Sequence, residues 1–188
     1  MKSIFTISVL FLVFTISTSV TFAGEHALAA HEHGSIKVGM AIEKNIVEID
    51  IDGPAESFLG FEYIPKSARE KKLLSDLEIK WTKNLESMIA FDKKLNCKVS
   101  EASFKQIIDE AETKEAQAKI KDSNKKEAGV HSDIEAKARL VCTANLNGSN
   151  VTISLKKVFK NMKKLSIDIL GTETKSVEIT TSVQTIKI

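Results

Sequence analysis

Apolar and polar side chains alternate over two neighbouring stretches, residues 36–42 and 47–51. A period of two is typical of strands that bury one face. Residues 43–45, Glu-Lys-Asn, lie between the two stretches and suit a tight turn. The pattern therefore predicts a β-hairpin, which the Gly-Pro pair at 53–54 ends.

After residue 67, apolar residues recur about every four positions instead of every two. Residues 55–65 form an apolar connector with room for one helical turn, and Ser67 and Glu70 then have the spacing of a capping box. The apolar positions that follow recur at helical spacing: Leu73, Leu77, Trp81, Leu85 and Met88 or Ile89. We predict one principal helix whose apolar stripe packs into the core.

The second half of the chain returns to strand-like content on both sides of a charged insert. Lys, Glu, Asp, Ala and Gln dominate residues 109–130, which predicts a solvated insert or a frayed helix. A short helix is expected within residues 156–164 and a turn at Gly171. The expected strands cover residues 96–108, 132–145, 151–155, 165–169 and 177–179, with an edge strand at 186–188. The predicted fold class is α+β, a mostly antiparallel β-sheet packed on one principal α-helix in a single domain.

The first 23 residues have the three-part order of a cleavable signal peptide. Met1 and Lys2 give a positive start, an uncharged apolar run follows, and Thr21-Phe22-Ala23 supplies small residues at a cleavage site. Ala27-Leu28-Ala29 is a second candidate site, and an uncleaved membrane anchor is the rival interpretation. We therefore expect an exported, periplasmic protein with a signal peptide at 1–23, a His-bearing segment at 24–34 and an α+β domain at 35–188.

The composition and net charge of the chain limit the classes of partner that it is expected to bind. The whole chain carries a formal net charge of +2, so the exported form is nearly neutral. Nucleic-acid binding usually requires a concentrated basic face, so no nucleic-acid partner is expected. Removal of the signal peptide leaves about 160 residues, a normal size for one domain, and no further segment is apolar enough to span a membrane.

Two cysteines, Cys97 and Cys142, remain after cleavage. An isolated pair in an oxidising compartment is most simply a disulfide, and the alternation of the surrounding segments predicts that Cys142 points inward. The loop that the bond closes suggests a stabilisation of about 4 kcal/mol. A redox pair or a thiolate metal site is the alternative, although the chain has no CxxC motif.

The histidines are the best candidates for metal binding. His26, His31 and His33 fall within eight residues, and His31 and His33 share one face of an extended segment. Neutral imidazole suits Zn²⁺, Cu²⁺ or Ni²⁺, and Glu32 or Glu25 could add a carboxylate. The alternative is a polar N-terminal tail without ligands. His131 ends the charged insert and by itself suits a solvated loop.

No other motif indicates chemistry. The sequence has no phosphate-binding glycine loop, no HExxH and no nucleophile motif, so we expect a protein that is not an enzyme.

The order of these landmarks resembles the ZrgA family, periplasmic proteins of Gram-negative bacteria that are induced by zinc limitation. The resemblance rests on residues 31–34 (HEHG), 53–55 (GPA), 60–65 (GFEYIP) and 140–145 (LVCTAN), and it covers nearly all of the exported chain. It implies a zinc-binding accessory that works beside a periplasmic zinc-transport system, without catalysis. It also marks His31 and His33 as candidate metal-associated positions.

One departure from the family lies between the cysteines. Family members usually carry a His-, Asp- and Glu-rich insert there, whereas residues 112–129 are rich in Lys and Glu and only His131 follows. For this chain, three interpretations remain: it binds one metal ion weakly, it binds a metal ion at a site that His131 completes, or it has lost the metal-storage role of the family. A non-catalytic protein-interaction module without a metal role is the rival function.

The cleavage position decides which ligands exist. Cleavage after Ala23 leaves a free amine on Gly24 with His26 in third place, and such a Gly24-Glu25-His26 terminus favours square-planar Cu²⁺ or Ni²⁺. Cleavage after Ala29 removes His26 and leaves His31 and His33 near the new terminus.

Overall fold

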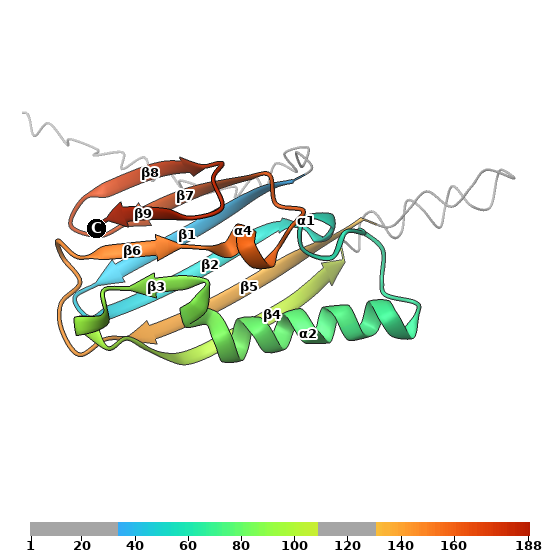
Figure 1. The fold of residues 1–188 in the computed structure, drawn as a ribbon, viewed down its shortest axis with the longest axis horizontal. Coiled ribbons are helices and arrows are strands. Elements are labelled where there is room, and N and C mark those ends of the chain that lie inside the picture. Colours follow the sequence, from blue (N-terminus) through green and yellow to red (C-terminus); the bar gives the residue numbers. More distant parts are fainter. Residues whose placement is uncertain (1–33, 109–130) are drawn as a thin grey trace, which may run out of the picture.

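A computed structural model describes residues 34–108 and 131–188, which form two β-sheets and three α-helices (Figure 1). The strands of the larger sheet lie in the order β4-β5-β2-β1-β7-β8, and those of the smaller sheet in the order β3-β6-β9. The helices are α1 Ala55–Leu59, α2 Ala68–Asn84 and α4 Leu155–Val158. The strands are β1 Ser35–Glu43, β2 Ile46–Pro54, β3 Ile89–Phe91, β4 Lys98–Ile108, β5 Ser132–Val141, β6 Asn150–Ile153, β7 Lys164–Leu170, β8 Thr174–Ile179 and β9 Gln184–Lys187.

The predicted hairpin is confirmed as β1 and β2. The two strands pair antiparallel, and Lys44 takes a positive φ of 55° in the turn between them. Alternate residues on one face of the hairpin are buried, as their alternation with polar residues predicts: Ile36, Val38, Met40, Val47, Ile49 and Ile51.

The α+β class is confirmed, with one exception to the antiparallel pairing. β1 pairs parallel with β7, and Val38 lies opposite Ile167. The other strand pairs are antiparallel. Alternation reveals which face of a strand is buried but says nothing about strand direction, so the parallel pair could not be predicted from it.

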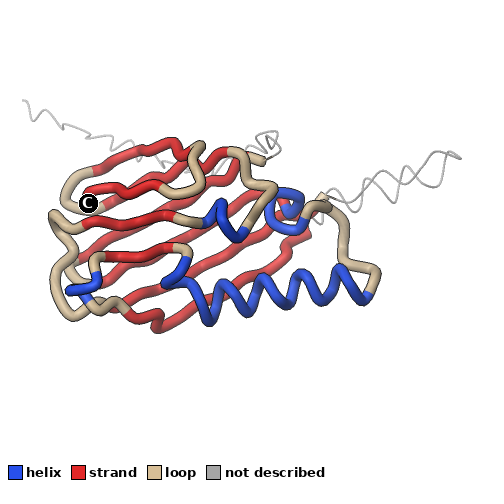
Figure 2. The backbone as a smooth tube through the Cα atoms, viewed as in Figure 1, coloured by secondary structure: helices blue, strands red, loops and turns tan. Residues whose placement is uncertain are grey.

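The core lies between the larger sheet and a covering layer. Figure 2 shows the smaller sheet and α2 over one face of the larger sheet. Phe58, Phe104 and Phe159 meet within this core, with ring centroids 5.2 to 6.3 Å apart. These three rings come from α1, β4 and the end of α4, so the aromatic contact joins segments far apart in the sequence.

The principal helix starts where the sequence predicts. The Ser67 hydroxyl accepts from the backbone N–H of Glu70, and the Glu70 carboxylate accepts from the backbone N–H of Ser67, which completes the capping box. Leu77 and Trp81 are buried, as expected. Leu73 is 37% exposed, however, so its place in the buried stripe is wrong. The neighbouring Leu74 takes this place instead, since it is partly buried and packs against the core.

The predicted length of this helix is also wrong. α2 ends at Asn84, Leu85–Ser87 form a 3-10 turn, and Ile89 belongs to β3. Leu85, Met88 and Ile89 are nevertheless buried. The chain stays in contact with the core while its backbone changes from helix to strand. The apolar residues therefore keep a helix-like spacing beyond the end of α2, and this spacing made the predicted helix too long.

Two further boundaries differ from the predictions. β5 ends at Val141, so Cys142 and the residues to Asn145 follow the strand rather than extending it, while Cys142 still points inward and is buried. Leu155 begins α4 instead of ending the preceding strand. The predicted insert at 109–130, the predicted signal peptide at 1–23 and all but the last residue of the predicted segment 24–34 lie outside the described residues, so the domain division stays a prediction.

The capping box gives stability a pH dependence. The backbone N–H of Ser67, the hydroxyl of Tyr63 and the backbone N–H of Lys66 lower the pKa of Glu70 from its ordinary 4.5 to about 2. A depressed carboxyl pKa stabilises the fold above the unfolded pKa and loses that effect as pH falls. We expect a contribution present above pH 4.5 that disappears as the pH approaches about 2.

Thermal unfolding of the wild type and of Glu70→Gln over this pH range checks the expectation. The melting temperature of the wild type should fall more steeply with acidification than that of Glu70→Gln. Glu78→Gln removes an exposed carboxylate from the same helix and should keep the wild-type slope. Parallel curves for wild type and Glu70→Gln would contradict the assignment.

Within residues 34–108 and 131–188, no element covers the other face of the larger sheet, which we name the open face. A groove of about 570 Å³ crosses it, with Gly39 and Ala41 of β1 in its floor and Leu170 of β7 at one side. Glu48 and Arg139 form an ion pair of 3.0 Å along this groove. Gly39 and Ala41 have little or no side chain beyond Cβ, so the face is hollowed at β1.

Candidate functional site

His131 lies at one end of the larger sheet, directly before β5. Its Nδ1 contacts the Glu62 carboxylate, which comes from the loop after α1. The His131 side chain is 63% exposed and that of Glu62 is 20% exposed. The pair therefore consists of a shielded carboxylate and an imidazole that is open to solvent.

The loop that carries Glu62 is held against the sheet by further hydrogen bonds. The Ser132 hydroxyl donates to the Glu62 carbonyl. Gln106 Nε2 of β4 donates to Ser132 Oγ at 2.7 Å and to the Tyr63 carbonyl at 3.2 Å. These contacts join the loop to both β4 and β5, so the position of Glu62 beside His131 is well defined.

The same loop is fixed on its other side by α2. The Tyr63 hydroxyl donates to Glu70 Oε1 at 2.8 Å, and this hydrogen bond is the main cause of a raised Tyr63 pKa. Phe61 stacks on Tyr63 with ring centroids 4.9 Å apart. The loop begins at Gly60, whose φ of 85° ends α1 in the left-handed conformation. Residues 60–65 thus form an anchored support for the carboxylate.

The contact has a clear chemical consequence. Histidines that bind metals commonly donate their second ring N–H to a carboxylate, which fixes the tautomer and the ring orientation. When Nδ1–H of His131 donates to Glu62, the lone pair for a metal lies on Nε2. Glu62 is therefore suited to orient His131 as one ligand.

One imidazole and one carboxylate do not make a zinc site, because Zn²⁺ usually takes three or four protein ligands. Among residues 34–108 and 131–188, no group of three or more His, Cys, Asp or Glu side chains could hold a metal ion. His26, His31, Glu32 and His33, predicted from the sequence, lie outside the described residues. Their predicted role is therefore untested by the structure.

The strand register nevertheless relates the two candidate regions. Lys37 of β1 lies opposite Asp52 of β2, and Asp52 lies opposite Glu135 of β5. By the same register, Ser35, two residues earlier in β1, lies level with Pro54 of β2, and Pro54 lies opposite Asp133 of β5. The chain thus enters β1 at the same end of the sheet at which His131 precedes β5, and β2 alone separates these strands.

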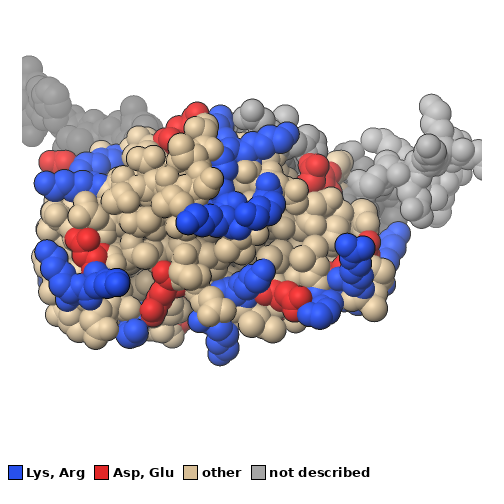
Figure 3. Space-filling model, in the orientation of Figure 1, with Lys and Arg blue, Asp and Glu red and all other residues tan. Residues whose placement is uncertain are grey.

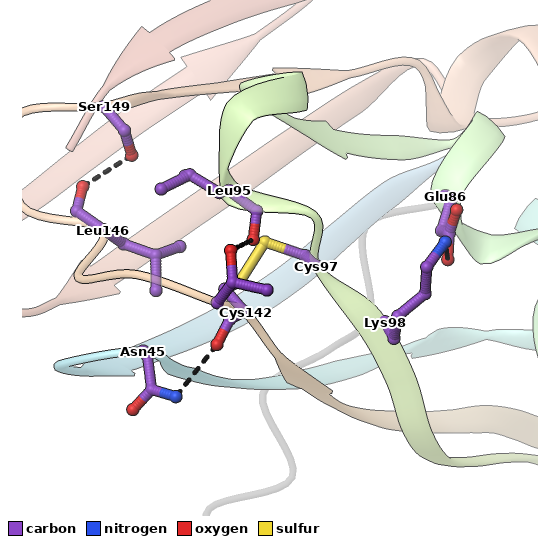
Figure 4. Close-up of a disulfide and its surroundings, with 9 residues drawn as sticks. Asn45, Glu86, Leu95, Cys97, Lys98, Cys142, Leu146 and Ser149 are labelled. Atoms are coloured by element: carbon purple, nitrogen blue, oxygen red, sulfur yellow. Dashed lines mark hydrogen bonds and ion pairs between the residues drawn. A yellow bond between two sulfur atoms is a disulfide. The ribbon is translucent and has the colours of Figure 1, made fainter.

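The cysteines lie at the opposite end of the sheet. Cys97 and Cys142 form the predicted disulfide (Figure 4). While the bond is formed, neither sulfur is a thiolate that could bind a metal ion, so the structure does not contain the thiolate metal site that the sequence left open. Hydrogen bonds between Asn45 and Cys142, 2.8 and 2.9 Å long, attach the bond to the β1–β2 turn. Cys97 lies just before β4 and Cys142 just after β5, so both flank strands instead of lying within them.

Sequence reasoning missed Glu62. His131 and Glu62 are 69 residues apart, and no local pattern relates them. The residue did stand within the GFEYIP segment that carried the family resemblance, but nothing there indicated an imidazole partner. Asp133 and Glu135, the carboxylates that follow His131 most closely in the sequence, lie further along β5.

These features define a disulfide-bonded α+β sheet protein with a histidine–carboxylate pair at one sheet end. A family model described as "ZrgA family zinc uptake protein" matches residues 30–188, and the chain belongs to this family. The matched range includes residues 31–33, His131 and both cysteines. No curated protein matches the chain. Within the described residues, no helix is long and apolar enough to cross a membrane.

Proposed function

We propose that this protein is a periplasmic, non-catalytic zinc-binding accessory that supports zinc uptake. Membership of a family described by zinc uptake supports a zinc-related role. The predicted signal peptide supports export to the periplasm. The Cys97–Cys142 disulfide is consistent with an oxidising compartment.

The His131–Glu62 pair carries the proposal. We infer that Nε2 of His131, oriented by Glu62, is one ligand of the zinc site. His31, His33 and Glu32 supply the remaining ligands, because their segment joins β1 at the same sheet end. The strand that follows His131 lies two strand spacings from β1, about 10 Å. A short segment spans that distance, since an extended residue covers roughly 3.3 Å.

Zinc is the cargo in this proposal, and its binding needs neutral imidazoles. Histidine has an ordinary pKa near 6.5, so affinity should fall as the pH drops below about that value. The protein would capture Zn²⁺ near neutral pH and pass it to a component of a zinc-transport system.

Calorimetric titration of the processed protein with Zn²⁺ tests the proposal. We expect a saturable binding heat that is lost in His31→Ala/His33→Ala. His131→Ala removes a ligand and should weaken binding about 100-fold, and Glu62→Gln should weaken it about 10-fold or more, as is typical of groups that orient a ligand. Glu101→Gln removes an exposed carboxylate near the disulfide end and should leave the affinity unchanged.

The absence of a binding heat, together with no competition against a chelator at micromolar protein, would contradict zinc binding. An unchanged affinity in His131→Ala would remove His131 and Glu62 from the site. Growth under zinc limitation separates the rival function, since a protein-interaction module should tolerate His31→Ala/His33→Ala without a growth defect.

The copper or nickel site at Gly24-Glu25-His26 depends on cleavage after Ala23. N-terminal sequencing of the exported protein decides this point. A first residue of Ala30 would eliminate the site, because His26 would have been removed.

A further inference from the structure

A dense group of lysines surrounds α4. Lys156, Lys157, Lys160 and Lys163 fall within eight residues, and no Asp or Glu occurs between Leu155 and Ile167. Phe159 and Met162 anchor this segment, since both are buried. The lysines next to these anchors lie on the outer side of the segment, and Lys157, Lys160 and Lys163 are all exposed.

Among the described residues, no acidic side chain neutralises the charge of this group. Lys156 Nζ donates to the carbonyls of Lys163 and Thr180, which are neutral acceptors. No carboxylate of the described ranges 34–108 and 131–188 forms an ion pair with Lys157, Lys160 or Lys163. We name the exposed set Lys157, Lys160 and Lys163 the α4 lysines.

Figure 3 shows Lys and Arg side chains gathered over α4, whereas Lys, Arg, Asp and Glu side chains alternate over the rest of the face that α2 and the smaller sheet form. The open face of the larger sheet has the opposite balance. The strand register places nine acidic side chains on it, against six basic ones. The acidic residues are Glu43, Glu48, Asp50, Asp52, Glu101, Asp133, Glu135, Asp168 and Glu178, and the basic ones are Lys37, Lys98, Lys105, Lys137, Arg139 and Lys164. The two faces therefore differ in their balance of acidic and basic side chains, although the chain as a whole is near neutral.

We propose that the face bearing the α4 lysines docks on an anionic phospholipid surface. Basic residues near such a surface each strengthen binding about fivefold. The acidic sheet face is repelled by the same surface, so the protein orients with α4 toward the lipid. This inference is independent of the proposed zinc site.

Two observations favour lipid over an acidic protein. The grooves of about 570 and 510 Å³, which would receive a protruding partner segment, both lie on the open face of the sheet. The α4 group also contains lysine only, whereas bidentate pairing with protein carboxylates is the property of arginine. A compact ammonium group suits laterally mobile phosphate headgroups, which need no fixed geometry.

Co-sedimentation with vesicles tests the proposal. The processed protein is mixed with vesicles of phosphatidylcholine alone or of phosphatidylcholine with phosphatidylglycerol. We expect binding only to the phosphatidylglycerol vesicles, and weaker binding as salt is raised, because salt screens exposed charges. Lys157→Gln/Lys160→Gln should reduce the partition coefficient at least about tenfold.

Lys37→Gln/Lys105→Gln is the matched control, because it removes the same charge from two exposed positions on the opposite face. Its partition coefficient should stay within about twofold of wild type. No binding to phosphatidylglycerol vesicles would overturn the proposal and leave an acidic protein as the partner of this face. Equal losses in the two double variants would also overturn it, since net charge alone would then explain the binding.

Discussion

Trp81→Ala is expected to lower the free energy of unfolding by about 3–5 kcal/mol, the range for truncating a large buried aromatic side chain. Trp81 is fully buried in α2, and its Nε1–H donates to the carbonyl of Lys137 in β5 at 3.0 Å. The side chain therefore attaches the principal helix to a central strand of the larger sheet. Truncation removes the packing and the hydrogen bond together and leaves a cavity.

Two variants separate these contributions. Trp81→Phe keeps most of the apolar contact but loses the hydrogen bond, so it should cost about 1–3 kcal/mol. Ile79→Ala lies on the same helix at a side chain that is 52% exposed, and it should cost no more than about 0.5 kcal/mol. Urea unfolding followed by far-UV circular dichroism suits all three, because Trp81 is the chain's single tryptophan and its variants lack that fluorescence. Similar losses in Trp81→Ala and Ile79→Ala would contradict this account.

Removal of the disulfide is the second large effect. Cys97 and Cys142 are 45 residues apart, and closing a loop of that length restricts the unfolded chain by about 4 kcal/mol in the chain-entropy model. Cys97→Ala/Cys142→Ala should therefore lose about 4 kcal/mol of unfolding free energy. Alanine is chosen because Cys142 is buried and a serine hydroxyl there would need a hydrogen-bond partner.

Urea unfolding with and without a thiol reductant measures this effect. Reduction should shift the wild-type midpoint to that of the double alanine variant, and it should leave the variant unchanged. The double alanine variant has no disulfide for the reductant to cleave. It is therefore the matched control for any other effect of the reductant on stability. A wild-type midpoint that does not respond to complete reduction would show that the bond contributes nothing to stability.

Local patterns predicted those parts of the fold that depend on neighbours in the sequence. The β1–β2 hairpin follows from two alternating stretches around a short turn, and the start of α2 follows from Ser67 and Glu70. The end of α2 could not be predicted in the same way. Leu85, Met88 and Ile89 stay buried whether the backbone is helix or strand, so their spacing does not report where the helix stops.

The candidate site also has a part that the sequence predicts and a part that only the structure shows. His31, His33 and His131 are candidates by residue type alone, and the sequence is sufficient to name them. Only the structure brings Glu62 to His131, because the contact depends on the loop after α1 being held against β4 and β5. A pairing across 69 residues arises from packing, which no short window of sequence contains.

By itself, the sequence determined the α+β class, the hairpin, the capped helix and the choice of disulfide partners, since two cysteines allow one pairing. The tertiary structure decided the parallel pairing of β1 with β7, the support of His131 by Glu62 and the distribution of charge. A net charge of +2 is a sum over the chain and carries no direction. Burial of one face of the larger sheet leaves its acidic residues on the open side, while buried Phe159 and Met162 turn the α4 lysines outward. This packing gives the two faces different balances of charge.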